Sequence, residues 1–539
     1  MVMNRRHLYK ILCIVLGLKL GLLSLLYLRS DSILKSQIFK ERSVNIDELL
    51  IDRRAEPTWE QRLELILEDI PSLPLVEMLA AKDEQQKLKC APLSKDIEFH
   101  NDYWQVAHAE NLTYYLFGAY YDCRETVVET PLVRLLAMIN ERGNTGAVYP
   151  KTHCQLWFKS QLQPVIVPVL DHKVIWFWWK AANHFYPTLM ECAVPSGEVP
   201  AMVSLVLEPC EKATNLLKVF YESAPLFPEQ KQLNETTVLE KDGSRPLKFA
   251  VCVKTMNFLY TDMSWRLIEW LELMRLLGAE KIVFYNGPMH ANMTRVLRHY
   301  VDEDRPGFVE LRPMSLARGE PNSPVHFHHY ALGADNFNSI LNEMIPYNDC
   351  FYRNMYRYDY IGLFDIDEVI MPLGNFTTWS DLLKFEKQSP DPNPNCKDSA
   401  SFCFRNAYFP NYEERPKFFQ QFPAYFYMLQ HVERTREYCD PGDATKCFHS
   451  TSYAIGLHNH APLYWKDRIC SARTLDVQYA QLHHYREPDT KSKLLDTVVD
   501  DNIWRFQPQL QNRTMAKYRK LGFLPTTRQQ RRDEEELQN

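Results

Sequence analysis

The hydrophobic pattern begins with one continuous apolar run close to the N-terminus. It covers residues 11–28 and follows the basic residues Arg5, Arg6 and Lys10. A helix of this length reaches about 27 Å, enough for a thin bilayer, and basic residues before such a run favour a cytoplasmic N-terminus. Lys19 in the middle of the run costs about 3 kcal/mol on insertion, which the surrounding leucines offset.

We therefore predict a cytoplasmic tail over residues 1–10, a single transmembrane signal anchor over residues 11–28 and a lumenal body after it. The rival interpretation is a cleaved signal peptide, but no small-x-small cleavage site follows the run. Residues 29–95 are charged and show helical spacing only around 58–69 and 75–89. We expect residues 29–95 to form a stem that holds the body away from the membrane.

A different pattern, of short aromatic and β-branched runs separated by turn residues, covers residues 96–245 and predicts a mainly β lumenal domain. The strand-like runs are residues 112–121, 155–158, 164–170, 173–179 and 201–207. The aromatic cluster at residues 176–179 suits either sugar stacking or packing in the core, and packing is the commoner use of such rings.

From residue 246 onward, strand-like and helical patterns alternate. The strand-like runs are residues 249–254, 281–285, 307–311 and 360–372, and the helical runs are residues 265–277, 293–300 and 329–344. Gly278 follows the first helical run as a candidate C-cap. Successive strand–helix units predict an α/β fold with a mostly parallel sheet, flanking helices and a ligand site at the carboxyl ends of the strands. We assign this domain to residues 246–520 and a charged tail to residues 521–539.

The last strand-like run ends in acidic residues that indicate a metal site. It starts at Tyr360 and leads into Asp365, Asp367 and Glu368. Since side chains alternate along a strand, Asp365 and Asp367 are expected to point to the same side. Two carboxylates there suit Mg²⁺ or Mn²⁺, which holds a diphosphate and neutralises its charge as it leaves. This arrangement is typical of sugar-nucleotide glycosyltransferases, although Asp-x-Asp also occurs by chance where a strand ends in solvent.

Length and charge narrow the function classes. A chain of 539 residues is long enough for two folded domains plus extensions. Acidic and basic residues are interspersed, and the formal net charge of −6 gives no basic footprint for nucleic acid. Aromatic residues make up 13% of the chain, which suits large cores or carbohydrate-stacking surfaces.

Cysteines and glycosylation triplets agree with a lumenal body. Of the 13 cysteines only Cys13 lies in the predicted anchor, so the remaining even number permits six disulfides in an oxidising compartment. No Cys-x-x-Cys pair occurs, which argues against a zinc ribbon or a thioredoxin-type site. The Asn-x-Ser/Thr triplets of a candidate glycoprotein begin at Asn111, Asn234, Asn292, Asn375 and Asn512.

Several segments between Lys248 and Arg486 resemble, in the same order, glycosyltransferase family 92. They are residues 266–278 with 280–285, 348–350, 360–372 and 484–486. The family has a GT-A type fold and galactosyltransferase members. The resemblance implies metal-dependent, inverting transfer of galactose from UDP-galactose to a glycan such as fucose on N-glycans, as a β-1,4-galactosyltransferase. With the predicted anchor, it implies a single-pass type II protein of the Golgi membrane whose catalytic domain is lumenal.

The resemblance also implies a set of metal ligands. Asp365 and Asp367 would bind the cofactor, Mn²⁺ or Mg²⁺, and through it the diphosphate of UDP-galactose. GT-A folds often add a histidine from the C-terminal part of the domain. His484 is the first choice for this third ligand, and His458 and His483 are alternatives.

Basic residues are candidates for binding the phosphates of the donor. Lys254 ends the first strand of the α/β domain, where GT-A folds place the nucleotide, and Arg486 is a second candidate. Arg266 either contacts phosphate or pairs with Glu269 on the same helix. The histidine-rich segment at residues 326–329 is expected to be a polar loop near the donor pocket rather than a metal cluster.

Inverting transfer needs a carboxylate that takes the proton of the acceptor hydroxyl. Glu368 is the catalytic candidate beside the aspartate pair, although it alternates away from the pair and could brace the strand instead. Glu437, Asp440 and Asp443 lie in a loop that is another possible source of the base.

Three other functions stay open. The nearest is a transferase that uses another UDP-sugar. A catalytically silent, glycan-binding lumenal protein is the second, and the intact Asp365 and Asp367 pair argues against it. A metal-dependent hydrolase is the third, but no histidine-rich two-metal signature accompanies the carboxylates. The predicted partners are a UDP-sugar donor, a glycan acceptor and the membrane, without nucleic acid.

Overall fold

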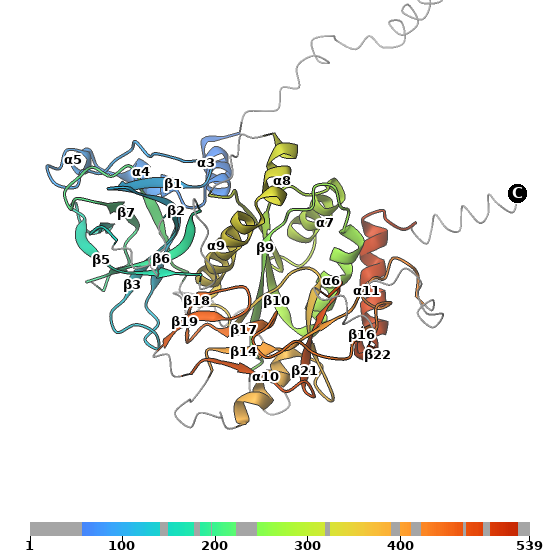
Figure 1. Ribbon diagram of the computed structural model, residues 1–539. Coiled ribbons are helices and arrows are strands. Elements are labelled where there is room, and N and C mark those ends of the chain that lie inside the picture. Colours follow the sequence, from blue (N-terminus) through green and yellow to red (C-terminus); the bar gives the residue numbers. More distant parts are fainter. Residues whose placement is uncertain are drawn as a thin grey trace, which may run out of the picture. The chain divides into compact units, whose positions relative to one another are not determined.

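The computed structural model describes residues 57–140, 149–176, 184–195, 197–222, 245–317, 324–389, 399–410, 422–466, 470–488 and 496–525 (Figure 1). The chain divides into two compact units, residues 1–65 and 66–539. In the first unit the described part is the beginning of helix α3 (Trp59–Asp69). The predicted tail at residues 1–10 and the anchor at residues 11–28 lie outside the described residues. Within the described residues, no helix is both long and apolar enough to span a bilayer.

The second unit begins with the short helices α4 (Leu75–Ala80) and α5 (Asp83–Gln86), followed by an eight-stranded sheet. Its strands are β1 (Gln105–Ala109), β2 (Leu112–Asp122), β3 (Leu132–Ile139), β4 (His153–Trp157), β5 (Val165–Val174), β6 (Tyr186–Ala193), β7 (Met202–Val206) and β8 (Leu217–Phe220). Their order is β1-β2-β3-β6-β5-β4-β7-β8, and β8 also pairs with β2, so the seven strands β2 to β8 close into a ring and β1 pairs with β2 outside it. The predicted runs 112–121, 155–158, 164–170 and 201–207 therefore overlap strands β2, β4, β5 and β7. The run predicted at residues 173–179 is not a separate strand, because only residues 173–174 belong to β5 and residues 177–179 lie outside the described residues.

A seven-stranded sheet follows, in the order β11-β10-β9-β12-β17-β14-β20. Its strands are β9 (Phe249–Thr255), β10 (Ala279–Asn286), β11 (Val309–Pro313), β12 (Tyr360–Leu363), β14 (Ser401–Phe404), β17 (Lys446–Ser450) and β20 (Ala472–Thr474). Strands β9 to β12 are mutually parallel, as the alternating pattern predicts, whereas β17 is antiparallel to β12 and β14. The whole sheet is therefore mixed.

Helices connect and cover the parallel strands. They are α6 (Ser264–Leu277), α7 (Ala291–Asp302), α8 (Val325–Ala334), α9 (Asn336–Asn354), α10 (Trp379–Gln388) and α11 (Gln507–Lys520), which packs on α6. Gly278 ends α6 with φ +112°, a backbone conformation that favours glycine, so the predicted C-cap is confirmed. The predicted helix over residues 329–344 is two helices that meet at Asp335. The predicted polar loop at residues 326–329 is wrong, because these residues lie within α8.

Helix α9 lies between the two sheets (Figure 1). It packs on β9 and β12 of the seven-stranded sheet and on β2, β3 and β6 of the eight-stranded sheet. Strand β3 is buried along its whole length, because its side chains point alternately into two different hydrophobic cores. Leu135 and Ala137 belong to the core inside the ring, and Leu136 and Met138 belong to the core shared with α9.

The strand predicted at residues 360–372 is two strands in different sheets. Strand β12 ends at Leu363, and β13 (Glu368–Pro372) joins β15 (Asn406–Tyr408) and β21 (Ala480–His484) in the order β13-β21-β15. Asp365 and Asp367 therefore lie in a turn, so the prediction that they alternate along one strand is wrong. Shorter elements complete the unit: β16 (Glu433–Thr435) with β22 (Thr497–Val499), β18 (Ala454–Leu457) with β19 (Pro462–Trp465), and the 3₁₀ helix η6 (Asn502–Phe506).

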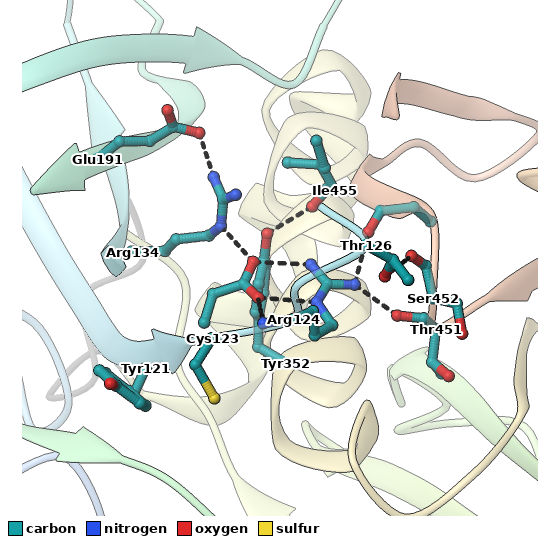
Figure 2. A network of polar contacts seen from close by, with 12 residues as sticks. Tyr121, Cys123, Arg124, Thr126, Arg134, Glu191, Tyr352, Thr451, Ser452 and Ile455 are labelled. Atoms are coloured by element: carbon teal, nitrogen blue, oxygen red, sulfur yellow. Dashed lines mark hydrogen bonds and ion pairs between the residues drawn. The ribbon is translucent and has the colours of Figure 1, made fainter. Parts of the chain in front are cut away.

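A buried polar network joins the eight-stranded sheet to the segment that leads from β17 into β18, as Figure 2 shows. Arg124, two residues after β2, donates to both carboxylate oxygens of Asp122 at 2.8 and 2.7 Å. It also donates to the carbonyl oxygens of Thr451 and Ala454 at 2.6 and 2.8 Å. Arg134 on β3 donates to the same Asp122 carboxylate at 2.8 Å. The guanidinium of Arg124 is therefore the link between the two regions, and Asp122 holds it in place.

Disulfides support the cores of the second unit. The described residues form the bonds Cys90–Cys210, Cys154–Cys192, Cys252–Cys350 and Cys403–Cys447. Cys470 is disulfide-bonded as well. Cys123 forms no disulfide, and its Sγ lies 3.5 Å from the hydroxyl of Tyr356, so the six disulfides that the cysteine count permits are not all formed.

Candidate active site

The turn between β12 and β13 is closed by two hydrogen bonds between its ends. The amide N–H of Asp365 donates to Glu368 Oε2 at 2.9 Å, and the amide N–H of Glu368 donates to the Asp365 carbonyl oxygen at 3.0 Å. Glu368 then starts β13, and the antiparallel register places it directly opposite His484 on β21. The sequence-distant His484 is thereby brought to the acidic turn.

This turn lines a cleft of about 570 Å³, a volume within the usual range for small-molecule sites. Strands β9 and β12 are parallel and both end here, so the cleft lies at the carboxyl ends of strands, where the fold pattern predicts it. Besides Asp365, Asp367 and Glu368, the polar lining residues include Lys254, Asn257, Asn336, Ser339, Glu343, His458, Asn459, His460, His484 and Arg486.

Asp365 lies between two lysines. Its Oδ2 is 3.5 Å from Lys254 Nζ and 3.8 Å from Lys446 Nζ. Burial by itself would raise the pKa of Asp365, but the two lysines hold that pKa well below its usual value. Lys254 is also 3.0 Å from Glu343 on α9, and Lys446 is 3.1 Å from Glu368. Asp365 is therefore a carboxylate at neutral pH.

Asp367 has a different environment from Asp365. Its Oδ2 lies 3.8 Å from His484 Nε2 and 3.9 Å from Arg266 Nη2. Burial and the nearby carboxylates of Glu368 and Asp365 raise the pKa of Asp367, although His484 opposes this. Burial lowers the pKa of His484, which favours the neutral imidazole that can coordinate a metal.

The donor atoms of this turn fit a hard divalent cation. Asp365 Oδ1 is buried and makes no hydrogen bond within the described part of the chain. Together with Asp367 and the imidazole of His484, it offers the oxygen and nitrogen ligands that Mn²⁺ accepts. Among the residues that the structure describes, no three His, Cys, Asp or Glu side chains already form a metal-binding group.

Of the three predicted phosphate-binding residues, two line the cleft and one does not. Lys254 and Arg486 line the cleft. Arg266, also in the described part, is not a lining residue, because its guanidinium stacks 4.2 Å from the ring of Tyr427 and donates to the carbonyl oxygen of Tyr485. Glu269, the predicted partner of Arg266, accepts hydrogen bonds from the backbone N–H groups of residues 427, 428 and 429.

The alternative candidates for the metal ligand and for the general base also differ in whether they line the cleft. His458 lines the cleft, whereas His483 is fully buried, stacks on Phe409 and interacts with Gln481. The alternative bases Glu437, Asp440 and Asp443, all of them described, are absent from the lining, although the next residue, Ala444, belongs to it.

Sequence reasoning missed two charged residues of the site, Glu343 and Lys446. Glu343 lies on α9 among apolar positions, and Lys446 begins the wholly buried strand β17. A charged residue at a core-facing position is the signal that could have found both, since such a charge needs a buried partner.

The match to known proteins covers this site. The model of glycosyltransferase family 92 matches residues 247–522, which is just over half of the chain and includes every polar lining residue named above. No curated protein gives a significant match to the chain. Because the family model spans the seven-stranded sheet, the acidic turn and the cleft, the chain belongs to glycosyltransferase family 92.

Proposed function

We propose that the protein is a metal-dependent, inverting galactosyltransferase with a GT-A type fold over residues 246–520. It transfers galactose from UDP-galactose in β linkage to a glycan, such as fucose on N-glycans. The observation that carries the proposal is the convergence of Asp365, Asp367, His484 and Lys254 on one cleft. Family membership supports transfer of a sugar, and the choice of galactose rests on the family resemblance.

Asp365, Asp367 and His484 would hold the Mn²⁺ or Mg²⁺ ion. The bound ion would supply positive charge that neutralises the departing diphosphate. Lys254 is 32% exposed at the cleft, and despite its burial the carboxylates of Asp365 and Glu343 raise the pKa of Lys254. It therefore stays protonated and offers a second positive charge to the donor phosphates, alongside Arg486.

We assign Glu368 a positioning role rather than that of the general base. Both of its oxygens face groups of the protein: Oε2 accepts from the Asp365 amide and pairs with Lys446, and Oε1 is 3.7 Å from His484. Its side chain is 2% exposed, so an acceptor hydroxyl has little access to it. Glu368 then keeps Asp365 and His484 in place on either side of the turn.

We also propose that residues 11–28 anchor the protein in the Golgi membrane as a single-pass type II protein. The disulfides of the body support a lumenal location, since such bonds form in oxidising compartments. Protease protection of the body in intact microsomes, with loss of protection after detergent, would test this topology. Digestion of the body without detergent would contradict it.

The catalytic proposal is tested by the release of UDP from each UDP-sugar with the full chain, Mn²⁺ and fucosylated N-glycans. We expect turnover with UDP-galactose that EDTA abolishes, Mn²⁺ restores and Asp367→Ala removes. Asp102→Ala, at an exposed aspartate of the other sheet region, is the matched control and should keep full activity. Turnover with a different UDP-sugar would overturn the galactose assignment. No turnover with any donor, from folded protein, would favour a silent glycan-binding protein.

A further inference from the structure

Three large aromatic side chains are exposed close to the cleft. Tyr260, in the segment after β9, is 64% exposed, and Phe327 and Tyr330 on α8 are 57% and 69% exposed. We call these three rings, with His326 and His329, the aromatic platform. Large apolar side chains that are exposed together on a surface often mark a binding site, whereas single exposed apolar side chains do not.

The rings of the platform support one another. Tyr260 stacks on His326 with ring centroids 5.6 Å apart and an interplanar angle of 16°, and its hydroxyl bonds to His326 Nδ1. The ring of His329 meets Tyr260 edge-on at 5.0 Å, and Phe327 lies 6.4 Å from Tyr330. Residues three and four apart share a helix face, so His326, His329 and Tyr330 lie along one side of α8. The platform is therefore an ordered surface.

The platform is continuous with the cleft. His329 Nδ1 lies 2.7 Å from the side-chain oxygen of Asn257, and Asn257 and Phe258 both line the cleft. Tyr260 follows Phe258 by two residues, and α9, which begins two residues after α8 ends, contributes Asn336 to the lining. A ligand in the cleft that extends past Asn257 would therefore meet the rings.

The charge pattern indicates which kind of ligand fits. Residues 324–334 contain no Asp, Glu, Lys or Arg. A phospholipid surface or a nucleic acid would be matched by lysines and arginines, which this segment lacks. A neutral oligosaccharide is different, because its C–H faces pack on aromatic rings while its hydroxyls hydrogen-bond to tyrosine and histidine.

We infer that the aromatic platform binds the acceptor glycan, through sugar residues beyond the one that receives the transferred sugar. The inference rests on the proposed function of the cleft and adds an acceptor subsite to it. Tyr260 and Tyr330 supply the stacking faces, and His329 holds α8 against the segment that lines the cleft. The donor contacts of Lys254 and Asp365 are separate from these rings.

The kinetic test uses the full chain and a pool of N-glycans released from secreted glycoproteins of animal cells. We expect Tyr260→Ala and Tyr330→Ala to raise the acceptor KM about tenfold each, the loss of one stacking contact. The KM for UDP-galactose and its slow hydrolysis without acceptor should stay unchanged. Leu170→Ala, which removes a side chain that is 57% exposed on β5, is the matched control. An unchanged acceptor KM in both tyrosine variants would overturn the inference while leaving the transferase proposal intact.

A binding experiment separates the two proposals. Saturation-transfer NMR with the same glycan pool, without any UDP-sugar, should show contact with the wild-type chain that both tyrosine variants weaken. This result would support the platform even if no donor is turned over. Absence of contact with the wild-type chain would overturn it. If the variants instead change the oligomeric state in light scattering, the platform is a self-association surface and the glycan assignment is wrong.

Discussion

Arg124 and Asp122 form a two-point ion pair that lies buried between the eight-stranded sheet and the segment after β17. Nε and Nη2 of Arg124 donate to the two oxygens of Asp122, and both side chains are nearly inaccessible, at 6% and 0% exposure. The remaining Nη1 reaches two backbone carbonyls of the other sheet region. Burial would raise the pKa of Asp122, but Arg124 and Arg134 hold that pKa well below its usual value.

We predict that Arg124→Lys destabilises the protein by about 1–3 kcal/mol, the usual cost of leaving buried hydrogen-bond acceptors without their donor. A lysine keeps the charge but cannot reproduce the planar fork that contacts Asp122, Thr451 and Ala454 together. Denaturant unfolding of the wild type and the variant measures the difference. Arg436→Lys is the control, because its pair with Asp496 is exposed and should contribute below about 1 kcal/mol. Equal effects of the two substitutions would contradict the proposed importance of the buried network.

Replacing Glu368 by Gln should weaken the acidic turn without removing the general base of the transfer reaction. The variant loses the ion pair with Lys446, and that lysine, which is 1% exposed, keeps Asp365 and the side-chain oxygen of Asn459 as neighbours. We expect the Mn²⁺ concentration for half-maximal activity to rise about 10- to 100-fold, as for other groups that orient metal ligands. The shape of the pH profile should stay the same at saturating Mn²⁺. A loss of kcat with unchanged Mn²⁺ dependence and a flattened acid-side pH response would instead identify Glu368 as the general base.

Buried histidines should make the fold sensitive to mild acid. Burial lowers the pKa of His449 to about 3 and that of His483 to about 4. Both are neutral when folded, but in the unfolded chain they bind a proton below about pH 6.5. The unfolded state then holds more protons, so stability is present above pH 6.5 and is lost as the pH falls from there toward the folded pKa values.

We predict that His449→Asn reduces this pH dependence by up to about 1.4 kcal/mol per pH unit between roughly pH 6 and pH 4. Asn can keep the hydrogen bond that His449 makes with Ser401. The free energy of unfolding measured at several pH values gives the slope. His108→Asn is the matched control, at a side chain that is 58% exposed, and should leave the wild-type slope unchanged. Equal slopes in all three proteins would contradict the assignment.

The Cys252–Cys350 disulfide should support the site as well as the fold. It joins β9, which carries Lys254, to α9, which carries Glu343, and closes a sequence separation of 98 residues. Replacing both cysteines by alanine should cost about 2–5 kcal/mol. Because the Lys254–Glu343 pair depends on this junction, we also expect donor KM to rise in the surviving folded protein.

The Cys90–Cys210 bond provides the comparison for this prediction. Its sequence separation of 120 residues is similar, but it lies outside the seven-stranded sheet. The double alanine variant at Cys90 and Cys210 should lose comparable stability and keep the donor KM. A donor KM that changes equally in both variants, or in neither, would show that the β9–α9 junction has no special effect on the cleft.

Local patterns in the sequence determined those structural elements that depend only on residues close together in the chain. The apolar spacing at residues 265–277 and the glycine after it specify helix α6 and its end, because helix periodicity and a left-handed cap involve only neighbouring residues. The parallel run of strands β9 to β12 follows from the strand–helix alternation for the same reason. Asp365 and Asp367 stood out because they follow an apolar run at close spacing.

Tertiary structure alone decided which other residues meet that pair. His484 reaches the acidic turn through the register of β13 with β21, and Lys446 through the pairing of β17 with β12. Such registers depend on contacts between segments about 80 to 120 residues apart, which no local period encodes. The break between β12 and β13 has the same origin, since each strand is held by a different sheet. The sequence by itself thus determined the family, helix α6 with its C-cap, and the acidic pair, and the packing of distant strands decided how the charges around that pair are arranged.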